Sequence, residues 1–301
     1  MIRWGLSYGH HDAAAVIMEG DTIIASKRYG TKDIYVQDID DLISIAGVPD
    51  EIYTHENKLR DALRKVISRD WYRLFPRTLS LPIKPIRGNH HLSHAAAGFY
   101  TSKFRDALVV VADAVGEMES LAVYRAHTGR LDTSPVFTLK YPDSVGLFYS
   151  YHTAMIGLQP NKDENKLMEL SLQSSYKNYP LVANTVDSFY RLGFKCIQNF
   201  HSYPEHIVTD PIEQKWIAAT TQHIAESYII NLVKRFTDNM MSNVVFTGGV
   251  AYNSLIKEAL IHQHHTVYVP SHPGDAGSAL GAILQHTHQH VELKDGKIFN
   301  V

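Results

Sequence analysis

Short segments in which apolar and polar residues alternate open the chain, a pattern that predicts β-strands rather than helices. Three such segments cover residues 2–7, 13–18 and 22–29. The last two are separated by a Glu-Gly-Asp sequence at residues 19–21, which is typical of a hairpin turn. Helical periodicity follows at residues 39–46 and 57–68, on either side of a predicted strand at residues 51–55.

The same order of elements returns in the second part of the chain. A helix is predicted from His90, then a buried strand at residues 106–112, and then a hairpin with strands at residues 121–126 and 134–139. The remaining segments are predicted as helices at 145–157, 212–239, 253–263 and 276–289, strands at 243–246 and 266–269, and a final hairpin or appendage at 291–301.

Two antiparallel hairpins that each lead into alternating helices and strands predict an α/β fold built by duplication. We expect one catalytic unit with two lobes, residues 1–105 and residues 106–301. A cleft between two such lobes is a common place for a nucleotide-like ligand.

Composition and charge narrow the class of protein. The chain has 301 residues, of which 45% are hydrophobic, and a formal net charge of −2, as is typical of a globular protein. This balance favours a nucleotide or small polar substrate over a long polyanion such as duplex nucleic acid. Cys196 is the only cysteine and cannot form an internal disulfide. The first residues lack a signal-peptide pattern, and the apolar stretch at 13–18 is too short for a bilayer, so we expect a cytoplasmic protein without a membrane partner.

Two histidines four residues apart, His90 and His94, begin one of the predicted helices. Residues with this spacing lie on one helical face, so the two imidazoles can bind a single metal ion. Asp113 closes a wholly apolar strand, where a carboxylate is costly unless it faces a site, and Asp275 begins a later helix. Two imidazoles and two carboxylates predict a site for iron, zinc or manganese. The alternative is one buried histidine with surface neighbours.

Glycine-rich turns join a strand to a helix at two places near the C-terminus. Gly248 and Gly249, with Asn253, follow one strand, and Gly274 and Gly277 follow the next. Glycines in such turns let backbone N–H groups approach a phosphate at the helix N-terminus. Glycines also allow helices to pack closely on a sheet, so one turn is weak evidence, but two in succession indicate a nucleotide-phosphate site.

Two polar segments hold further candidates. His11 and Asp12 lie between the first two strands, where they form either a polar hairpin tip or, if the hairpin faces the cleft, a general base and its orienting partner. Lys166 lies in a charged segment, residues 161–166, that is typical of a solvated loop when taken alone.

Seven short motifs occur in a fixed order over almost the whole chain. They are Gly5-Leu6-Ser7 with His11-Asp12-Ala13-Ala14; His90-His91-Leu92-Ser93-His94-Ala95-Ala96; Asp113 with Gly116-Glu117; Ser144-Val145-Gly146-Leu147-Phe148-Tyr149-Ser150; Pro160-Asn161 with Asp163-Glu164 and Lys166; Gly248-Gly249-Val250-Ala251 with Asn253; and Gly274-Asp275-Ala276-Gly277 with Ala279-Leu280-Gly281. With these motifs the chain resembles the O-carbamoyltransferases of antibiotic and nodulation-factor biosynthesis, specifically their N-terminal catalytic domain. That domain is similar to the tRNA threonylcarbamoyl-adenosine synthases and has a duplicated actin/hexokinase-like (ASKHA) fold.

The resemblance implies transfer of a carbamoyl group from carbamoyl-adenylate, made from carbamoyl phosphate and ATP, to a hydroxyl on a nucleotide, modified base or sugar. The residues that match the family's metal ligands are His90, His94, Asp113 and Asp275. Iron is the first expectation for the divalent metal, ahead of manganese and zinc. The candidate adenylate contacts are Gly248, Gly249, Asn253, Gly274 and Gly277. The candidate catalytic residues are His11, as base for the acceptor hydroxyl, Asp12 and Lys166.

The chain departs from the family pattern at several positions. Two glutamates usually precede an Arg-Phe pair after the third strand, where this chain has Ser26-Lys27-Arg28-Tyr29. Ala114 and Glu169 stand where glycines are usual. We expect these changes to affect the acceptor pocket more than the metal site.

Family members usually continue into a YrdC-like domain that makes carbamoyl-adenylate, whereas this sequence stops at Val301. We therefore expect either a separate YrdC-like partner or formation of the adenylate by the chain itself. Two alternatives are a relative of the tRNA threonylcarbamoyl-adenosine synthases and a non-catalytic nucleotide-binding subunit. The motifs at residues 144–150 and 161–166 and the lack of a basic run argue against the first, and the four retained metal-ligand candidates argue against the second.

Overall fold

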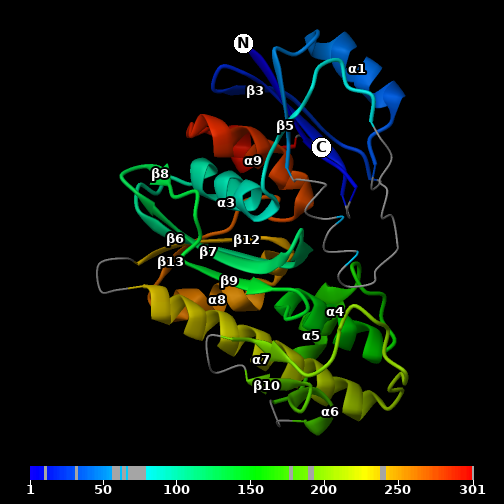
Figure 1. Ribbon diagram of the computed structural model, residues 1–301. Helices are drawn as coiled ribbons and strands as arrows, with labels where there is room; N and C mark the ends of the chain where they lie inside the picture. Colours follow the sequence, from blue (N-terminus) through cyan, green and yellow to red (C-terminus); the bar gives the residue numbers. More distant parts are fainter. Residues whose placement is uncertain are drawn as a thin grey trace.

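The computed structural model describes residues 1–9, 12–30, 33–55, 62, 66, 79–175, 179–188, 193–237 and 242–299. Two large sheets lie above and below a pair of helices, as Figure 1 shows. The helix predicted at residues 57–68 falls almost entirely outside the described residues.

The first sheet has the strand order β3-β2-β1-β4-β5. Its strands are β1 (Ile2–Ser7), β2 (Ala14–Glu19), β3 (Thr22–Arg28), β4 (Glu51–Thr54) and β5 (Ile86–Arg87). The first three are antiparallel neighbours, and β4 and β5 continue the sheet in parallel from β1. On the outer face, Ile39 and Leu42 of α1 (Val36–Ala46) join a core cluster with Trp4 and Ile17.

The second sheet repeats this plan, with the order β13-β12-β6-β7-β8 and β9 also paired to β7. Its strands are β6 (Ala107–Gly116), β7 (Glu119–His127), β8 (Arg130–Leu131), β9 (Phe137–Lys140), β12 (Asn243–Thr247) and β13 (Thr266–Tyr268). Strand β6 forms a hairpin with β7, while β12 lies parallel to both β6 and β13. An antiparallel hairpin extended by two parallel strands therefore occurs twice, which confirms the predicted duplication.

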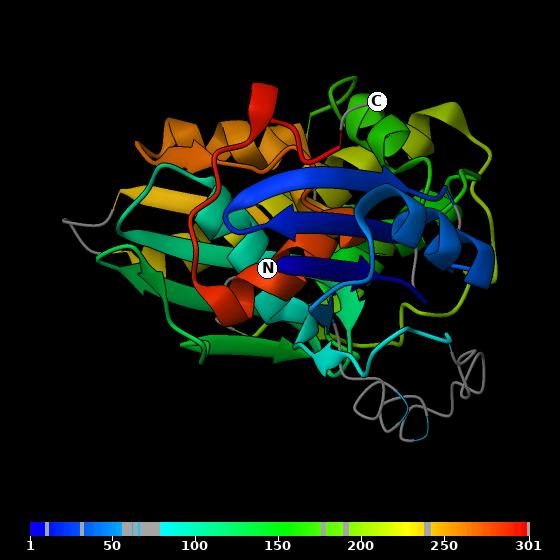
Figure 2. The ribbon, with the colours of Figure 1, turned by 90° about the horizontal axis from the view of Figure 1, so that it is seen from above.

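Helices α3 (His90–Thr101) and α9 (Asp275–Thr287) fill the space between the sheets. Their apolar residues share one core cluster with β2, β6 and β7. Close approach needs glycine on both sides: a Cβ atom at Gly5 of β1 would collide with the Ala279 carbonyl, and one at Gly281 of α9 with the Ser93 carbonyl. Figure 2 shows the first sheet lying over α9 from above.

The other face of the second sheet is covered by helices of the C-terminal part. These are α4 (Val145–Met155), α5 (Glu164–Ser171), α6 (Pro180–Ala183), α7 (Pro211–Phe236) and α8 (Ser254–His262). The remaining short elements are β10 (Val186–Ser188), β11 (Lys195–Cys196), η1 (Gly249–Tyr252) and η2 (Lys294–Gly296). Among the described residues, no helix is both long enough and apolar enough to cross a membrane.

One prediction of local structure was wrong. The segment at residues 161–166 is not wholly a polar loop, because α5 begins at Glu164 and buries Leu167 and Ser171; a helix of 8 residues is too short to show clear periodicity. The tail was predicted as a hairpin or an appendage, and its described part is an appendage that contains η2. It packs as a strap, with the Ile298 carbonyl accepting a hydrogen bond from Ser26 at 2.8 Å. The predicted lobe boundary at residues 105 and 106 falls between α3 and β6 and stays a prediction.

The contact between α3 and α9 leads to a test of stability. We expect Gly281→Ala to lower the free energy of unfolding by about 1–3 kcal/mol, because the added methyl group overpacks against the Ser93 backbone. This loss would occur although alanine favours a helix by about 1 kcal/mol over glycine. Urea unfolding measures it. Gly193→Ala is the control, since a Cβ atom there meets no atom within 4 Å in the described part of the chain; equal midpoints for both variants would contradict the packing argument.

Candidate active site

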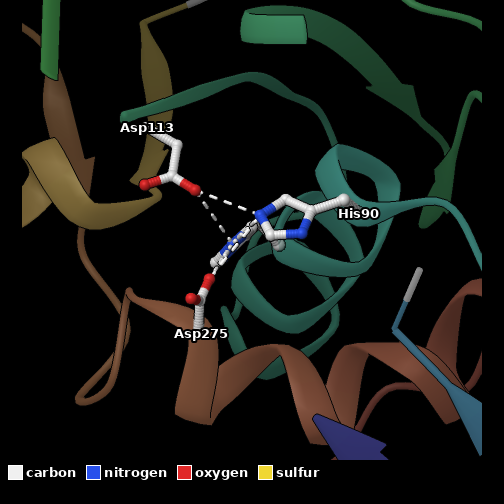
Figure 3. Close-up of side chains that lie close together, drawn as sticks. His90, Asp113 and Asp275 are labelled. Atoms are coloured by element: carbon white, nitrogen blue, oxygen red, sulfur yellow. Dashed lines mark hydrogen bonds and ion pairs between the residues drawn. The ribbon is translucent and has the colours of Figure 1, made fainter. Parts of the chain in front are cut away.

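The four predicted metal ligands lie close together. Figure 3 shows three of them, His90, Asp113 and Asp275, with their side chains directed toward one another. His90 and His94 come from successive turns at the start of α3, Asp113 from the end region of β6, and Asp275 is the first residue of α9. Asn89 caps α3 by accepting a hydrogen bond from the Leu92 backbone, which fixes the helix start that carries both histidines.

The facing atoms of these residues have the spacing of ligands around one ion. His90 Nε2 lies 3.1 Å from Asp113 Oδ2 and 3.6 Å from Asp275 Oδ1. His94 Nε2 lies 3.7 Å and 3.4 Å from the same two oxygens, and 3.2 Å from the other Nε2. Metal–ligand bonds of ~2.1 Å place neighbouring ligand atoms roughly 3.0–3.4 Å apart in octahedral or tetrahedral coordination. All four candidate ligand atoms lie within 4.8 Å of one another, so the cluster has the size of a site for one metal ion.

Hydrogen bonds around the cluster orient these ligand atoms. His94 donates from Nδ1 to the Pro273 carbonyl at 3.0 Å, so the lone pair of the neutral ring is on Nε2, facing the cluster. Asp113 accepts from the backbone N–H groups of Ala114 and Gly249 on Oδ1, at 2.9 and 3.3 Å. Its Oδ2 is thereby directed toward the histidines.

The charge balance of the cluster also fits a cation. His90, His94 and Asp275 are buried. Burial alone would raise the pKa of Asp113, but the hydrogen bond with His90 and the charges of both histidines hold that pKa below its ordinary value. When both imidazoles are neutral, the cluster carries two carboxylate charges, which a divalent cation compensates.

A cavity of about 450 Å³ opens beside the cluster, with Asp113 and Asp275 in its wall. The described lining also includes Asp12, Ala114, Asn253 and residues of α4, of the segment that leads into α5, of α5, of η1 and the residue before α9. This volume is in the usual range for small-molecule sites. A smaller and more open groove of about 300 Å³ lies between α5, α7 and α8, away from all four ligands, so we assign the chemistry to the larger cavity.

Glycines of the two glycine-rich turns allow close packing of the backbone, in addition to the contact with the adenylate that is predicted for them. Gly248 has a φ of +90°, and a Cβ atom there would collide with the Ala112 carbonyl of β6. Gly277 has no space for a side chain because the His272 carbonyl lies against it. Gly249 and Gly274 line the cavity, whereas Gly248 and Gly277 are not among its described lining residues. Adenylate binding by these four glycines stays a prediction.

Asn253 lines the cavity, and its side-chain amide is hydrogen-bonded to that of Gln222. Nothing in the sequence indicated this pairing. Asn253 Nδ2 donates to Gln222 Oε1 at 2.8 Å, and the Tyr149 hydroxyl donates to the same oxygen at 2.8 Å. Its Oδ1 accepts from the Ile256 backbone and caps α8. The sequence contained one usable signal for this position, an asparagine at the start of the helix predicted at residues 253–263.

The predicted catalytic residues lie in different places. His11 is outside the described residues, and Asp12 lines the cavity. Lys166 pairs with Asp163 at 2.9 Å, has a side chain that is 58% exposed, and is not among the cavity residues, so its role stays a prediction. Lys162 is the one cation among the described lining residues. Sequence reasoning missed it because the start of α5 was not predicted.

Comparison with known proteins shows the family to which the chain belongs. The carbamoyltransferase N-terminus family matches residues 77–284, which is more than half of the chain and includes all four ligands. An uncharacterized protein of Synechocystis sp. is 28% identical over 226 residues, covering 67% of this chain and 36% of that protein. The nodulation protein NolNO of Sinorhizobium fredii is 24% identical over 217 residues, covering 67% of this chain and 31% of that protein. The chain spans less than half the length of these relatives.

Solved structures confirm the actin/hexokinase-like fold. The activator of 2-hydroxyisocaproyl-CoA dehydratase from Clostridium difficile, with bound ADPNP, superposes with a TM-score of 0.57 at 18% identity and covers 96% of each chain. A ROK hexokinase from Thermus thermophilus has a TM-score of 0.50 at 16% identity, covering 95% of this chain and 100% of that one. At such identities the likeness shows the fold alone.

Proposed function

Since the chain belongs to the carbamoyltransferase N-terminus family, we propose that its cavity transfers a carbamoyl group from carbamoyl-adenylate to an acceptor hydroxyl. The observation that carries this proposal is the cluster of four metal-ligand side chains, two of them in the wall of a cavity of ligand size. A non-catalytic subunit would not need Nε2 of His94 oriented by the Pro273 carbonyl.

In the proposed reaction the acceptor oxygen forms a bond to the carbamoyl carbon, and the bond from that carbon to the phosphate oxygen breaks. AMP leaves, and the hydroxyl proton passes to a base or to water. A divalent ion held by His90, His94, Asp113 and Asp275, with iron as our first choice, would bind the adenylate phosphate and offset its charge.

The protein's own groups would position the donor along the cavity wall. Lys162 supplies a positive charge for the phosphate, which gains charge as AMP leaves. Asn253, fixed by Gln222, offers a polar contact whose orientation is set before the donor binds. The ADPNP bound to the dehydratase activator of similar fold supports a nucleotide as co-substrate.

The carbamoyl-adenylate donor must also be supplied. We propose that a YrdC-like protein or domain makes the adenylate, and that the acceptor is a small molecule or a nucleotide, consistent with the net charge of −2.

A direct assay tests the proposed function. The protein is incubated with carbamoyl phosphate, ATP, ferrous iron and candidate sugars and nucleosides, with and without a YrdC-like protein. Mass spectrometry should find an acceptor that gains one carbamoyl group, together with AMP. No carbamoylated acceptor under any of these conditions, while the adenylate itself is formed, would contradict the proposal.

The two lysines of the α4–α5 segment offer a matched pair of variants. We expect Lys162→Met to slow single-turnover release of AMP by about 10²-fold, because one charged contact to the leaving phosphate is lost. Lys166→Met should change the rate by no more than about 3-fold, since its partner is Asp163. If Lys166→Met slowed AMP release more than Lys162→Met, the result would instead support Lys166 as the catalytic lysine, as predicted from the sequence.

A further inference from the structure

An aromatic ring, Tyr252, lies at the mouth of the cavity next to the metal-ligand cluster. It ends η1, lines the cavity, and is nevertheless 57% exposed. The ring lies over Gly274, where an added Cβ atom would be 3.0 Å from Cε2 and 3.4 Å from the hydroxyl oxygen. Gly274 therefore leaves room for the ring one residue before Asp275. One side of the ring is supported by backbone, and much of the rest is open to solvent or to a ligand.

An ion pair from the first lobe lies beside this ring. Arg28 Nη2 is 3.2 Å from Asp12 Oδ2, and the two side chains are 43% and 35% exposed. Burial raises the pKa of the Tyr252 phenol, and the nearby charges of Arg28 and Asp12 act on it in opposite directions. Asp12 lines the cavity, whereas Arg28 is not among the described lining residues and reaches this side of the cavity through its ion pair with Asp12.

These groups are separate from those that we assign to the donor. Lys162 and Tyr149 come from the α4–α5 region, and Asn253 is buried and turned toward Gln222. Tyr252 and the Asp12–Arg28 pair instead bridge η1 and the end of β3, on the side of Asp275. The chain has Ser26-Lys27-Arg28-Tyr29 at this end of β3, which is where we expected the acceptor side to differ.

We propose that Tyr252, Asp12 and Arg28 form the acceptor subsite and select a hydroxylated ring, either a sugar or the ribose of a nucleoside. The ring packs its flat face on Tyr252, as sugar and base rings do on aromatic side chains. Neighbouring hydroxyls donate to the Asp12 carboxylate and accept from the Arg28 guanidinium. A third hydroxyl is then directed toward Asp275 and the donor. This inference rests on the proposed function, whose acceptor it defines.

Binding of two simple probes without any donor tests the subsite. The probes are methyl β-D-glucopyranoside, for a sugar, and uridine, for a nucleoside, each titrated by saturation-transfer NMR. We expect saturable binding of at least one of them, weakened about 10-fold by Tyr252→Ala and within about 3-fold of wild type for Tyr252→Phe. Tyr203→Ala is the matched control, because Tyr203 is 77% exposed and is not a cavity residue.

The outcomes separate this inference from the proposed function. If neither probe binds saturably, or if Tyr252→Ala and Tyr203→Ala bind equally well, the subsite is wrong. If carbamoyl transfer occurs but Tyr252→Ala and Arg28→Met leave the acceptor KM unchanged, the subsite is again wrong and the proposed function stands. Binding that depends on Tyr252, without transfer to any hydroxyl, would support the subsite and contradict the proposed function.

Discussion

Asp275→Asn is expected to weaken metal binding by about 10²-fold and to slow carbamoyl transfer at a fixed metal concentration by about 10²–10³-fold. The substitution keeps the side-chain shape at the first position of α9 but removes a negative charge that lies 3.4 Å from His94 Nε2. An uncharged amide oxygen is a poorer ligand for a divalent cation. Raising the metal concentration should therefore recover part of the lost rate.

In metal-free protein, we expect Asp275→Asn to change the stability of the fold. Asp275 raises the pKa of Asp113 through charge repulsion, so removal of its charge should make the metal-free fold slightly more stable. Thermal unfolding with and without metal measures both effects. Asp210→Asn at the N-cap of α7 is the control, because its carboxylate accepts a hydrogen bond from the Ile212 backbone and is not part of the metal-ligand cluster. Equal metal affinity for Asp275→Asn and Asp210→Asn would rule out Asp275 as a ligand.

Gly248→Ala is expected to have the largest effect on stability, about 2–4 kcal/mol of the free energy of unfolding. Two penalties add: the backbone at φ +90° and ψ 170° is accessible almost only to glycine, and the new methyl group would collide with the Ala112 carbonyl. Because that carbonyl directly precedes Asp113, and Gly249 N–H holds Asp113 Oδ1, metal affinity should fall as well.

The control for this variant is Gly129→Ala in the turn between β7 and β8. Gly129 also has a positive φ, +83°, but a Cβ atom there would meet only His290 Nε2, at 3.7 Å. Urea unfolding should therefore show a smaller loss for Gly129→Ala, and metal titration should show none. Unchanged metal affinity in Gly248→Ala would show that this turn does not position Asp113.

The elements that could be predicted from the sequence are those in which the local pattern of apolar and polar residues matches the burial of these residues in the fold. Alternation in the two hairpins reflects strands that are paired locally, and the apolar strand at residues 107–112 is buried on both faces. The four ligands were predictable because each lies at the end of a strand or the start of a helix, where such patterns change. His90 and His94 in addition have a spacing that fixes them on one helical face.

The rest could not be predicted because it depends on contacts between distant segments or on short helices. Lys162 replaces Lys166 at the cavity because α5 begins at Glu164, within a segment typical of a loop. Gln222 supports Asn253 from the middle of α7, where nothing in the local sequence marks it. Asp12 and Tyr252 are 240 positions apart in the sequence, and only the folded chain brings both to the wall of one cavity.

The most direct test of the account is a single turnover of preformed carbamoyl-adenylate at graded metal occupancy, with AMP and carbamoylated acceptor measured together. We expect both products to rise in proportion to bound metal and to reach their maximum at one ion per chain, held by the four residues of the cluster. Full transfer in the presence of chelator, or metal-dependent AMP release that never yields a carbamoylated hydroxyl, would contradict it.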